Sequence, residues 1–443
     1  MKFELSKNHN PNYVGSVVEI THLRPHTNAD KIQIATIFGN SVIVGLDVEI
    51  GDVGMFFPLE SQLQPAFLHQ HNLYSKSELN SDEKKKGFFD VKGRVKAVRL
   101  RGEKSEGIFI PIEISTDNEA KETSQYVGKD FDTINDELVV KKYIVRESAA
   151  QSVKSKSDKK LVKKFDKIVE NQFRLHVDTE QLKKNIHKLN LDDIIGVHYK
   201  KHGTSWVVAN VLTNKVLKWW EKMLKYLGVK IEDKEYGSVY SSRKVVKNRY
   251  INTGNSGSYY AYDLWTDINE KLFPLTPKGW TLYGEAIGFM PDGGYIQKPF
   301  DYGCKPGEYK LYIYRITITN TDGKVIELDD KQIEEFCEKN GLLYKDTFMY
   351  YGTVEDHLFQ LSDEISQTDQ GKANWRDDYI RLLVKNYNDK DCYMCTTKVP
   401  EEGIVIRKQK LYDYDAFKLK SFRFLEKETK DLDDGVVDVE SQN

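Results

Sequence analysis

The segment Val197–Val208, with the sequence VHYKKHGTSWVV, decides how the second half of this chain folds. Apolar residues on both sides of Gly203 predict two strands joined by a tight turn. A glycine in such a turn lets the backbone approach a bound ligand closely. The turn begins with Lys200, and a lysine acts as a nucleophile only where burial or neighbouring cations lower its pKa. Strand alternation would turn the next residue, Lys201, to the opposite face. Taken alone, a Lys-Lys pair at a turn indicates an exposed surface.

Four more segments follow this one in a fixed order, each with residue types suited to a nucleotide site. They are Tyr283–Glu285, Leu311–Ile316, Glu402–Val405 and Lys418–Lys420. Chance produces each short match often, but it rarely produces the whole series in order. Together with Lys200, they indicate a site that attaches a nucleotide to a lysine and then passes it on.

Two of these segments place a carboxylate within an apolar strand, where a charge needs a partner. Ribose hydroxyls would serve Glu285. A divalent cation or a metal-bound water would serve Glu402, because hard cations prefer carboxylate oxygen. A cross-strand ion pair with Lys or Arg is the alternative for each carboxylate.

Aromatic and basic residues complete the series. Tyr312 and Tyr314 share one face of an alternating strand, where either ring could stack on a purine or belong to the core. Lys418 and Lys420 share another strand face with a spacing that suits one phosphate group, although a solvated face is the usual reason for such a pair. Arg243 is suited to grip a phosphate through two hydrogen bonds.

Composition and patterning divide the chain into four regions. Residues 1–146 hold closely spaced short apolar runs between turn residues, which favours a small β-barrel or sandwich. Residues 147–164 are rich in Ser and Lys and predict a charged linker. Residues 165–430 mix helical and strand patterns, and residues 431–443 form an acidic tail that we expect to be disordered.

Individual elements can be predicted within these regions. The expected strands of the first region are Ser16–Ile20, Ile32–Ala35, Val42–Gly45, Met55–Phe57, Val95–Leu100 and Gly107–Pro111. The expected helices of the third region are Thr179–His187, Asn214–Leu227, Asp330–Asn340 and Asp377–Asn388. The second of these helices carries Trp219 and Trp220, which we assign to a buried face.

The net charge of the 443-residue chain is -2. The tail Asp431–Asn443 holds five acids and no Lys or Arg, so residues 1–430 carry a net charge of +3. A nucleic-acid partner must therefore be held by local basic patches rather than by the charge of the whole chain. The candidate phosphate contacts in the first region are Arg94, Lys96, Arg99, Arg101 and Lys104. A solvated basic strand face is the alternative for this group.

The four cysteines are too few for a disulfide scaffold and favour an intracellular location, which for a viral protein would be the host cytoplasm. Cys392 and Cys395 have the spacing of half a zinc knuckle. Cys304 and Cys337 do not form a second such pair, so we expect reduced thiols rather than zinc. The chain lacks both an apolar run of about 20 residues, which a membrane span needs, and a secretory signal at its start.

The ordered series resembles the covalent nucleotidyltransferase superfamily of polynucleotide ligases and RNA capping enzymes. Within it, the Lys-x-His-Gly-Thr pattern at Lys200–Thr204 is more similar to RNA ligases than to the Lys-x-Asp-Gly usual in DNA ligases and capping enzymes. Phe173–Leu182, together with Asn185, resembles the lead-in to the nucleophile in the Deinococcus–Naegleria type, the fifth RNA ligase family. In that family an OB-fold domain precedes the catalytic domain, and Pro25–Lys31 and Phe57–Leu63 look like parts of it.

The resemblance covers most of residues 15–425 and implies an α+β fold. An N-terminal OB-fold β-barrel would be followed by an adenylyltransferase domain of ATP-grasp-like antiparallel sheets plus helices. The resemblance also implies three chemical steps that use ATP and Mg²⁺ or Mn²⁺. Lys200 takes AMP from ATP, the AMP passes to the 5′-phosphate of an RNA end, and a 3′-hydroxyl then expels the AMP.

The resemblance also implies roles for individual residues. Those with catalytic roles are Lys200 as nucleophile, Glu285 at the ribose, Glu402 at the metal, and Lys418 and Lys420 at the phosphates. Those with nucleotide contacts are His202, Gly203, Arg243, Tyr312 and Tyr314, with Tyr314 stacked on adenine. Two positions depart from the family: Tyr199 stands where many relatives have Glu, and Arg315 stands where Asp is common. The chain also has extra sequence between Lys200 and Glu285 and between Ile316 and Glu402.

Together these features favour an ATP-dependent RNA ligase that joins 3′-hydroxyl and 5′-phosphate ends. Its substrates would be nicks in duplexes of RNA, or of RNA and DNA, and it would act as a monomer. A ligase of DNA ends is less favoured because of His202. A GTP-dependent mRNA capping guanylyltransferase is the enzymatic alternative, although those enzymes usually carry their OB domain after the catalytic domain. A non-catalytic RNA-binding relative is the alternative from another class, and the retained lysines and carboxylates argue against it.

Overall fold

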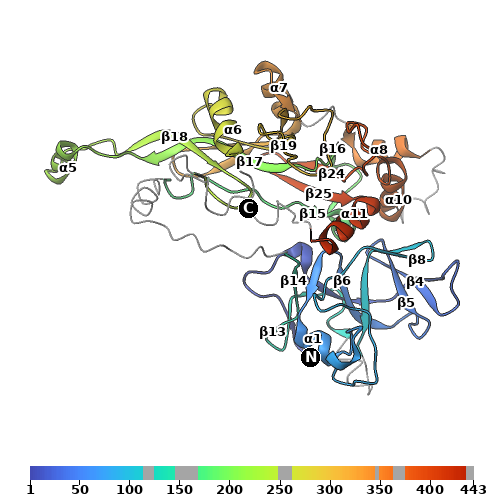
Figure 1. Cartoon of the computed structure of the whole chain (residues 1–443). Helices are drawn as coiled ribbons and strands as arrows, with labels where there is room; N and C mark the ends of the chain where they lie inside the picture. The colour runs from blue at the N-terminus through green and yellow to red at the C-terminus, as the bar shows by residue number, and fades with distance from the viewer. Residues whose placement is uncertain (113–123, 145–167, 248–261, 345–348, 363–374, 436–443) are drawn as a thin grey trace.

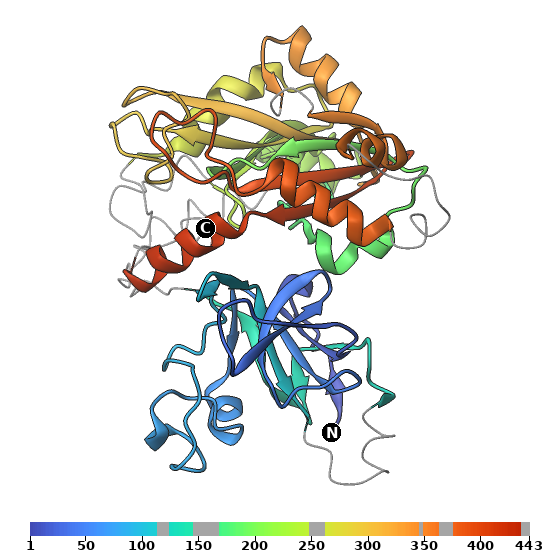
Figure 2. The ribbon, with the colours of Figure 1, turned by 90° about the vertical axis from the view of Figure 1, so that its right-hand side faces the viewer.

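The computed structural model describes residues 1–112, 124–144, 168–247, 262–344, 349–362 and 375–435. An N-terminal barrel lies below a larger C-terminal domain, and the last helix of the chain lies between them (Figure 1 and Figure 2). The predicted linker at 147–164 is outside the described residues. Within the described part, no helix is long and apolar enough to cross a membrane.

Short strands build the N-terminal barrel. They are β1 (Phe3–Glu4), β2 (Gly15–Glu19), β3 (Leu23–Pro25), β4 (Ile32–Ile37), β5 (Asn40–Gly45), β6 (Val53–Pro58), β7 (Ser61–Leu63), β8 (Val98–Leu100), β9 (Glu103–Ser105), β10 (Gly107–Pro111), β11 (Asp130–Phe131), β12 (Thr133–Ile134), β13 (Glu137–Leu138) and β14 (Val140–Lys142). The order β10-β6-β2-β11 forms the central sheet, and smaller sheets surround it. The helix α1 (Pro65–Gln70) follows β7. Of the strands predicted here, all are found within a few residues, except that Val95–Leu100 is extended only from Val98.

The hairpin of β4 and β5 shows how local sequence shapes the barrel. The strands pair from Ile32 opposite Gly45 to Ile37 opposite Asn40, so the loop consists of only two residues, Phe38 and Gly39. Both loop residues have positive φ, 49° and 68°. This is the conformation of two-residue hairpin loops whose twist matches that of the paired strands.

Two largely antiparallel sheets form the C-terminal domain. The strands of the first sheet, in spatial order, are β15 (Glu180–Gln181), β25 (Tyr414–Lys420), β24 (Gly403–Gln409), β16 (Ile194–Tyr199) and β23 (Tyr350–Thr353). Those of the second sheet are β18 (Lys234–Ser241), β17 (Thr204–Asn214), β19 (Trp280–Gly288), β20 (Tyr309–Thr319) and β21 (Val325–Glu327), with β22 (Leu343–Tyr344) also beside β20.

Several α-helices accompany these sheets in the second half of the chain. They are α4 (Leu182–Asn185), α5 (Trp219–Tyr226), α6 (Leu264–Leu272), α7 (Asp330–Lys339), α8 (Val354–Leu361), α10 (Trp375–Tyr387) and α11 (Phe422–Asp433). The second sheet packs against α6 and α7 through a core that includes Trp206, Leu282, Ile313, Leu264, Ile268 and Ile333. The first sheet packs against α8 and α10 through a core that includes Ile195, Ile406, Phe417, Leu358, Tyr379 and Leu383.

The segment Val197–Val208 crosses from one sheet to the other. Its first strand, β16, pairs with β23 and β24, whereas its second strand, β17, pairs with β18 and β19. The two predicted strands are therefore present but do not pair with each other. The residues Lys200–Gly203 span the gap between the two layers.

Two of the four predicted helices agree with the structure, and two differ from it. Helices α7 and α10 match their predictions within two residues at the ends. The stretch Thr179–His187 instead contains β15 and the single turn α4. The stretch Asn214–Leu227 is helical only from Trp219, because β17 continues to Asn214. Trp219 and Trp220 are exposed, so their assignment to a buried face is wrong.

Helix α11 joins the two domains. It begins after Ser421, whose hydroxyl accepts a hydrogen bond from the N–H of Phe424 at the helix N-terminus. Phe422 and Leu425 belong to the hydrophobic core of the barrel, not to that of the C-terminal domain. The helix continues to Asp433, so the region predicted as a disordered tail from residue 431 begins within a helix. Residues 436–443 lie outside the described part.

A buried ion pair joins the first sheet to helix α7. Arg407 of β24 donates from Nη1 to Oδ1 of Asp330 at 2.8 Å and from Nη2 to the carbonyl of Leu328 at 2.5 Å. Gln409 donates to Oδ2 of the same carboxylate at 2.9 Å, and Nε2 of His198 lies 3.3 Å from it. Because Leu328 follows β21 of the second sheet, this cluster fixes the two sheets relative to each other.

We expect Asp330→Ala to lower the free energy of unfolding by about 3–5 kcal/mol, because it leaves the charge of Arg407 buried without its partner. Glu335→Ala, an exposed change on the same helix, is the control and should alter it by less than about 0.5 kcal/mol. Urea unfolding followed by circular dichroism measures both variants. Equal stability of the two would contradict a structural role for the ion pair.

Candidate active site

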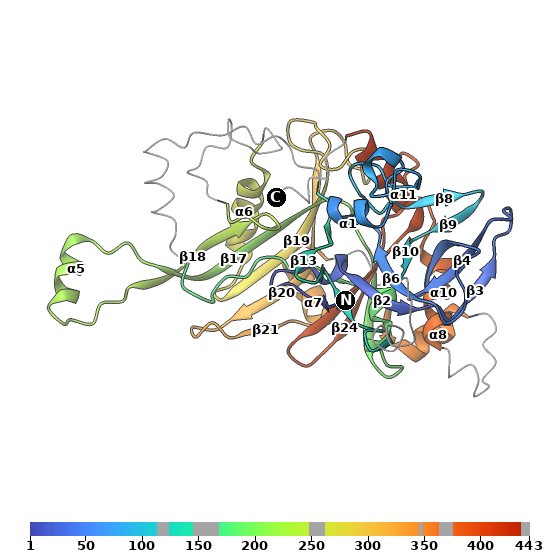
Figure 3. The same ribbon diagram turned by 90° about the horizontal axis from the view of Figure 1, so that it is seen from below.

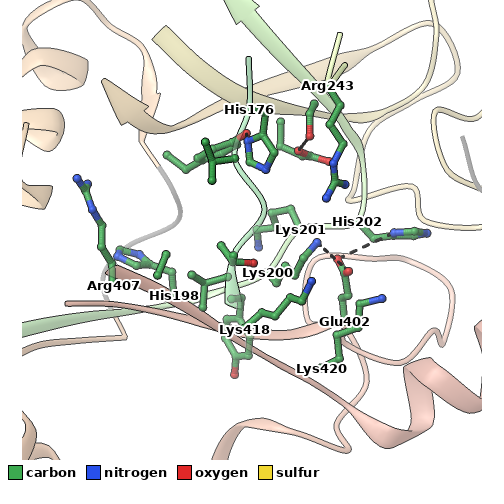
Figure 4. A pocket seen from close by; sticks show the side chains of 18 of the residues that line it. His176, His198, Lys200, Lys201, His202, Arg243, Glu402, Arg407, Lys418 and Lys420 are labelled. Carbon is green, nitrogen blue, oxygen red and sulfur yellow. Dashed lines mark hydrogen bonds and ion pairs between the residues drawn. The ribbon is translucent and has the colours of Figure 1, made fainter. Parts of the chain in front are cut away.

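A cavity lies where the two sheets and the barrel meet. Its volume is about 1220 Å³, counting the open solvent at its mouth. The predicted site residues that line it are Lys200, His202, Arg243, Glu285, Tyr312, Tyr314, Glu402, Lys418 and Lys420. Gly203 lies in the turn beside them. The structure thus brings the residues predicted for a nucleotide site to one place (Figure 4), while their roles in binding remain predictions.

Lys200 lies at the crossing between the sheets. Its backbone N–H donates to the carbonyl of Gly403 at 2.8 Å, which ties the turn to the start of β24. Its Nζ lies 2.8 Å from Oε1 of Glu402. Since Glu402 directly precedes Gly403, the backbone contact that fixes the turn also brings the two side chains together.

Glu402 can hold a hard divalent cation. Its side chain is 3% exposed, and Oε2 accepts no hydrogen bond from the described residues. Nδ1 of His202 lies 4.0 Å from this oxygen. Burying a carboxylate oxygen without a hydrogen-bond donor costs free energy unless a ligand binds to it. Mg²⁺ and Mn²⁺ prefer carboxylate oxygens as ligands. Among the described residues there is no group of three or more His, Cys, Asp or Glu side chains suited to a metal, so bound phosphate and water would supply the other ligands.

Glu285 positions the turn that carries the lysine. It lies on β19, opposite Ser205 of β17. Its Oε1 accepts the backbone N–H of Gly203 at 3.2 Å, and its Oε2 accepts the hydroxyl of Ser205 at 3.0 Å. A Cβ at Gly203 would lie 2.2 Å from the carbonyl oxygen of Ala286, so only glycine fits here. The carboxylate that was predicted to contact ribose therefore also has a structural task.

The ring of His202 is fixed by aromatic neighbours. Its edges meet Phe300 and Phe424 at centroid distances of 5.0 and 4.9 Å and at steep angles. Its backbone N–H donates to the hydroxyl of Tyr302 at 2.7 Å. These contacts hold the imidazole beside Glu402 at the side of the cavity.

Tyr312 and Tyr314 of β20 both line the cavity. Tyr312 is buried. The hydroxyl of Tyr314 lies 2.8 Å from Nδ1 of His176, and the two rings meet edge to face. His176 belongs to the stretch before β15, so this stretch forms part of the cavity wall.

The two lysines of β25 differ in their surroundings. Lys418 is buried, and this burial, together with the positive charge of Lys420, lowers its pKa to about 8. Lys420 lies 2.9 Å from Glu60 and 3.5 Å from Glu428. Burial opposes its charge, but these carboxylates outweigh burial and hold the pKa of Lys420 well above its usual value.

Glu60 of the barrel enters the cavity, and sequence reasoning missed it. Burial alone would raise the pKa of this carboxyl, but Lys420, Lys142 and Lys418 lower it to about 2. Glu60 has a φ of 65°, in the left-handed region, at the turn between β6 and β7. It lies within a stretch that resembles an OB domain, yet its partner Lys420 stands 360 positions away in the sequence.

Arg243 forms an ion pair with Asp178 at the edge of the cavity. Burial opposes the ionisation of Asp178, but Arg243 outweighs it and holds the pKa of this carboxyl at about 2. The sequence predicted a phosphate contact for Arg243 and did not identify Asp178. A phosphate would have to share the guanidinium with this carboxylate.

Lys201 turns away from Glu402 into a cage of tyrosine rings. Its Nζ lies 5.2–5.9 Å from the ring centroids of Tyr199, Tyr302, Tyr312 and Tyr393. It also lies 3.0 Å from the sulfur of Met394. The neighbouring Cys392 and Cys395 carry free thiols. Lys200 and Lys201 thus have different neighbours, although both line the cavity and both lie between β16 and β17 rather than in a strand.

The basic residues predicted to contact nucleic acid mostly hold the barrel to helix α11. Arg94, which is 4% exposed, donates to the carbonyl of Thr429 at 2.8 Å and pairs with Asp433 at 3.1 Å. Lys96 also pairs with Asp433, and Arg99 pairs with Glu426. In this conformation, Arg94 is not accessible to a phosphate. The sequence did not predict that the acidic residues of α11 would pair with these basic residues of the barrel.

The other two members of the group have different surroundings. Arg101 is exposed and donates to the carbonyl of Asn28. Lys104 lies 3.5 Å from Glu106 and above the ring of Phe422. Arg99 and Arg101 are the exposed members of the five, and Arg99 is held by Glu426.

Arg315 has a structural place outside the cavity. It is buried between the rings of Tyr283 and Tyr414 and forms a bidentate ion pair with Glu327 of β21. The expected residue at this position was Asp. Here the guanidinium of Arg315 instead joins β20 to β21. Tyr199 lines the cavity and packs beside Tyr393.

The fold agrees with comparisons to known proteins. A family model described as an OB-fold domain matches residues 14–112. A mutant RNA ligase of Naegleria gruberi solved with ATP and Mn has a TM-score of 0.57 and 16% identity, over 95% of this chain and 100% of that one. A mutant of the same ligase with AMP and Mn has a TM-score of 0.54 and 16% identity, over 93% and 98%. The ligase with pyrophosphate has a TM-score of 0.53 and 16% identity, over 94% and 98%.

Among curated protein sequences, none matches this chain significantly. At 16% identity, the structural likeness shows the fold. The predicted α+β class, with an N-terminal OB-fold domain and a second domain of mixed sheets and helices, is confirmed.

We expect Lys418 to titrate near pH 8 rather than near the usual lysine value of about 10.4. The negative charge of Glu60 raises the pKa of Lys418, so Glu60→Gln should lower it further. Carbon-13 NMR of the reductively methylated protein measures this titration, and Lys418→Arg identifies the signal. A Lys418 signal that titrates near pH 10, or that does not respond to Glu60→Gln, would contradict the assigned environment.

Proposed function

We propose that this chain is an ATP-dependent RNA ligase that joins a 3′-hydroxyl to a 5′-phosphate through lysyl-AMP and RNA-adenylate intermediates. The contact of Lys200 with Glu402, in a cavity that also contains Glu285, Lys418 and Lys420, supports this function most directly. The fold it shares with a Naegleria gruberi RNA ligase solved with ATP, AMP and pyrophosphate adds support.

In the first step, Nζ of Lys200 attacks the α-phosphorus of ATP. A bond forms between this nitrogen and phosphorus, the bond from the α-phosphorus to the bridging oxygen breaks, and pyrophosphate leaves. The attacking amine must be neutral, and Oε1 of Glu402, 2.8 Å away, is placed to accept its proton. The positive charges of Lys418 and Lys420 favour the neutral amine and stabilise the negative charge that develops on the phosphates.

In the second step, an oxygen of the RNA 5′-phosphate attacks the phosphorus of lysyl-AMP. The bond between phosphorus and nitrogen breaks, and Lys200 takes up a proton again. In the third step, the 3′-hydroxyl attacks the phosphorus of the RNA 5′-phosphate and releases its proton. The phosphodiester bond forms, and AMP leaves.

Side chains around the cavity would orient the nucleotide. Adenine would lie against Tyr312 or Tyr314, because both line the cavity and tyrosine rings stack on bases. Glu285 would contact the ribose, and it also holds the turn at Gly203. Glu402 would hold Mg²⁺ or Mn²⁺ through Oε2, and the cation would neutralise charge on the phosphates.

RNA phosphates would be bound by basic residues of the barrel that are open to solvent. Arg101 meets this condition in the structure, whereas Arg94 and Arg99 would first have to leave α11. We further propose that the protein acts inside the cell, as a monomer, on nicks in RNA duplexes or in hybrids of RNA and DNA. The free thiols fit a reducing compartment.

The test compares the wild type with Lys200→Ala on two substrates. One is a nicked RNA duplex with a 5′-phosphate, ATP and Mn²⁺, and the other carries a chemically pre-adenylylated 5′ end without ATP. We expect Lys200→Ala to lose joining on the first substrate by about 10³-fold or more and to retain it on the second, because the lysine only takes up and transfers AMP.

Other results would contradict this function. Loss of joining on both substrates would give Lys200 a structural role instead. Transfer from GTP but not from ATP would favour capping chemistry, and no joining by the wild type on either substrate would favour RNA binding alone. A nicked DNA duplex of the same sequence serves as the control for the choice of nucleic acid.

A further inference from the structure

A two-stranded arm extends from the second sheet and carries helix α5 at its tip (Figure 1 and Figure 3). The inner half of β17, up to Ala209, pairs with both β18 and β19. Its outer half, Asn210–Asn214, pairs with Lys234–Ser238 of β18 but not with β19. The arm therefore projects beyond the sheet, and β17 connects its tip directly to the turn that holds Lys200.

The helix at the tip presents an apolar face to solvent. Trp219 is 77% exposed and Tyr226 is 90% exposed. The other exposed apolar residues around them are Val216, Trp220, Met223, Leu227 and Val229. On a helix, positions three, four and seven apart lie on one side, so Trp219, Met223 and Tyr226 form one surface. A cluster of large apolar side chains at the end of an arm indicates a binding surface.

The tip is also positively charged. Residues 214–234 contain six lysines and three acids, a net charge of +3. Two of the acids are engaged within the tip, since Glu221 pairs with Lys215 at 3.1 Å and Asp233 pairs with Lys225 at 2.6 Å. The exposed Lys218, Lys222 and Lys230 surround the aromatic face. Lysines interleaved with exposed aromatic rings suit a polyanion that has flat bases to stack.

Local hydrogen bonds hold the tip in place without a core of its own. Oε2 of Glu221 accepts the N–H of Lys218 at 2.6 Å and caps the start of the helix. The N–H of Val229 donates to the carbonyl of Leu224, and that of Lys215 donates to the carbonyl of Asp233. The aromatic face is thus presented in a fixed arrangement, which lowers the entropic cost of binding.

The length of the arm fits a long nucleic-acid substrate. Strand β17 has 11 residues, which corresponds to about 35 Å. At roughly 3.4 Å between the phosphates of one strand, about ten nucleotides would span this distance. A strand whose end lies at Lys200 could therefore reach the tip with nucleotides about ten positions away from the joint.

We propose that helix α5 and its flanking lysines form a second RNA contact, which binds unpaired nucleotides about 35 Å from the end being joined. Trp219 and Tyr226 stack on bases, and Lys218, Lys222 and Lys230 contact phosphates. This inference rests on the proposed function, because that function makes RNA the substrate.

The test uses the full chain with the double substitution Trp219→Ala and Tyr226→Ala. Phe359→Ala, an exposed aromatic residue on α8, is the matched control. Fluorescence anisotropy measures binding of a labelled RNA with a nick and a single-stranded extension of more than about ten nucleotides, and of the same RNA without the extension. Formation of the AMP adduct is measured in the same samples by intact mass.

We expect the double variant to bind the extended RNA about tenfold or more weakly, because loss of one stacked ring costs about that much. Binding of the RNA without the extension and formation of the AMP adduct should not change. Phenylalanine at both positions should restore binding, because the rings are retained. Lys222→Glu should weaken binding of the extended RNA and reduce its dependence on salt.

Three outcomes would overturn the inference. Equal binding of the extended RNA by wild type and double variant would show that the tip does not contact RNA. If the double variant loses binding to phosphatidylserine vesicles but binds the extended RNA as the wild type does, the tip contacts a membrane surface. If its oligomeric state changes while its RNA binding does not, the tip contacts a second copy of the chain. If the wild type forms no AMP adduct, the proposed function fails, while the anisotropy comparison still decides the role of the tip.

Discussion

The cavity depends on how the chain crosses between the two sheets at Lys200–Gly203. One backbone hydrogen bond, from Lys200 to Gly403, fixes the start of the crossing against β24. The carboxylate of Glu285 fixes its other end through the N–H of Gly203 and the hydroxyl of Ser205. Because the sheets are themselves tied together by the buried pair of Arg407 and Asp330, the crossing cannot shift without disturbing the core. Lys200 is therefore held beside Glu402 before any ligand arrives, and such preorganisation would favour the proposed attack by its amine.

Charge balance explains why the barrel lies against the cavity. Lys418 is buried and the side chain of Lys420 is only 11% exposed, and two like charges in such a place need counter-charges. Glu60 supplies one from the barrel and Glu428 supplies another from α11, the helix whose Phe422 and Leu425 complete the barrel core. A phosphate that binds Lys420 must share it with Glu60 or displace that carboxylate. In the proposed function, nucleotide binding and the contact between the domains would thus act on the same ammonium group, which is the physical condition for coupling between them.

Much of the candidate site could be predicted from the sequence, because its residues lie on strands and turns with readable patterns. Glu285 and Glu402 each place a charge in or beside an apolar strand, where it needs a partner. Lys200 and Lys418 were identified by their order in the series of segments. The sequence could not reveal Glu60 or Asp178, because their partners come from segments far along the chain. The basic group around Arg94 was predicted as an open surface, but the acids of α11 cover part of it. The sequence analysis assigned Trp219 and Trp220 to the buried face of a helix, and only the structure shows that the arm carries them away from every described core.

The central claim is that Lys200, and not the adjacent Lys201, forms the covalent bond to AMP. The most direct measurement is intact mass after incubation with ATP and Mn²⁺, followed by tandem mass spectrometry of the modified peptide. Wild type, Lys200→Ala and Lys201→Ala would be compared, with a check that the purified protein was not already adenylylated. We predict an AMP adduct on Lys200 that is absent from Lys200→Ala and is still formed, even if more slowly, by Lys201→Ala. An adduct that persists in Lys200→Ala, or one that maps to Lys201 or Lys418, would contradict the account.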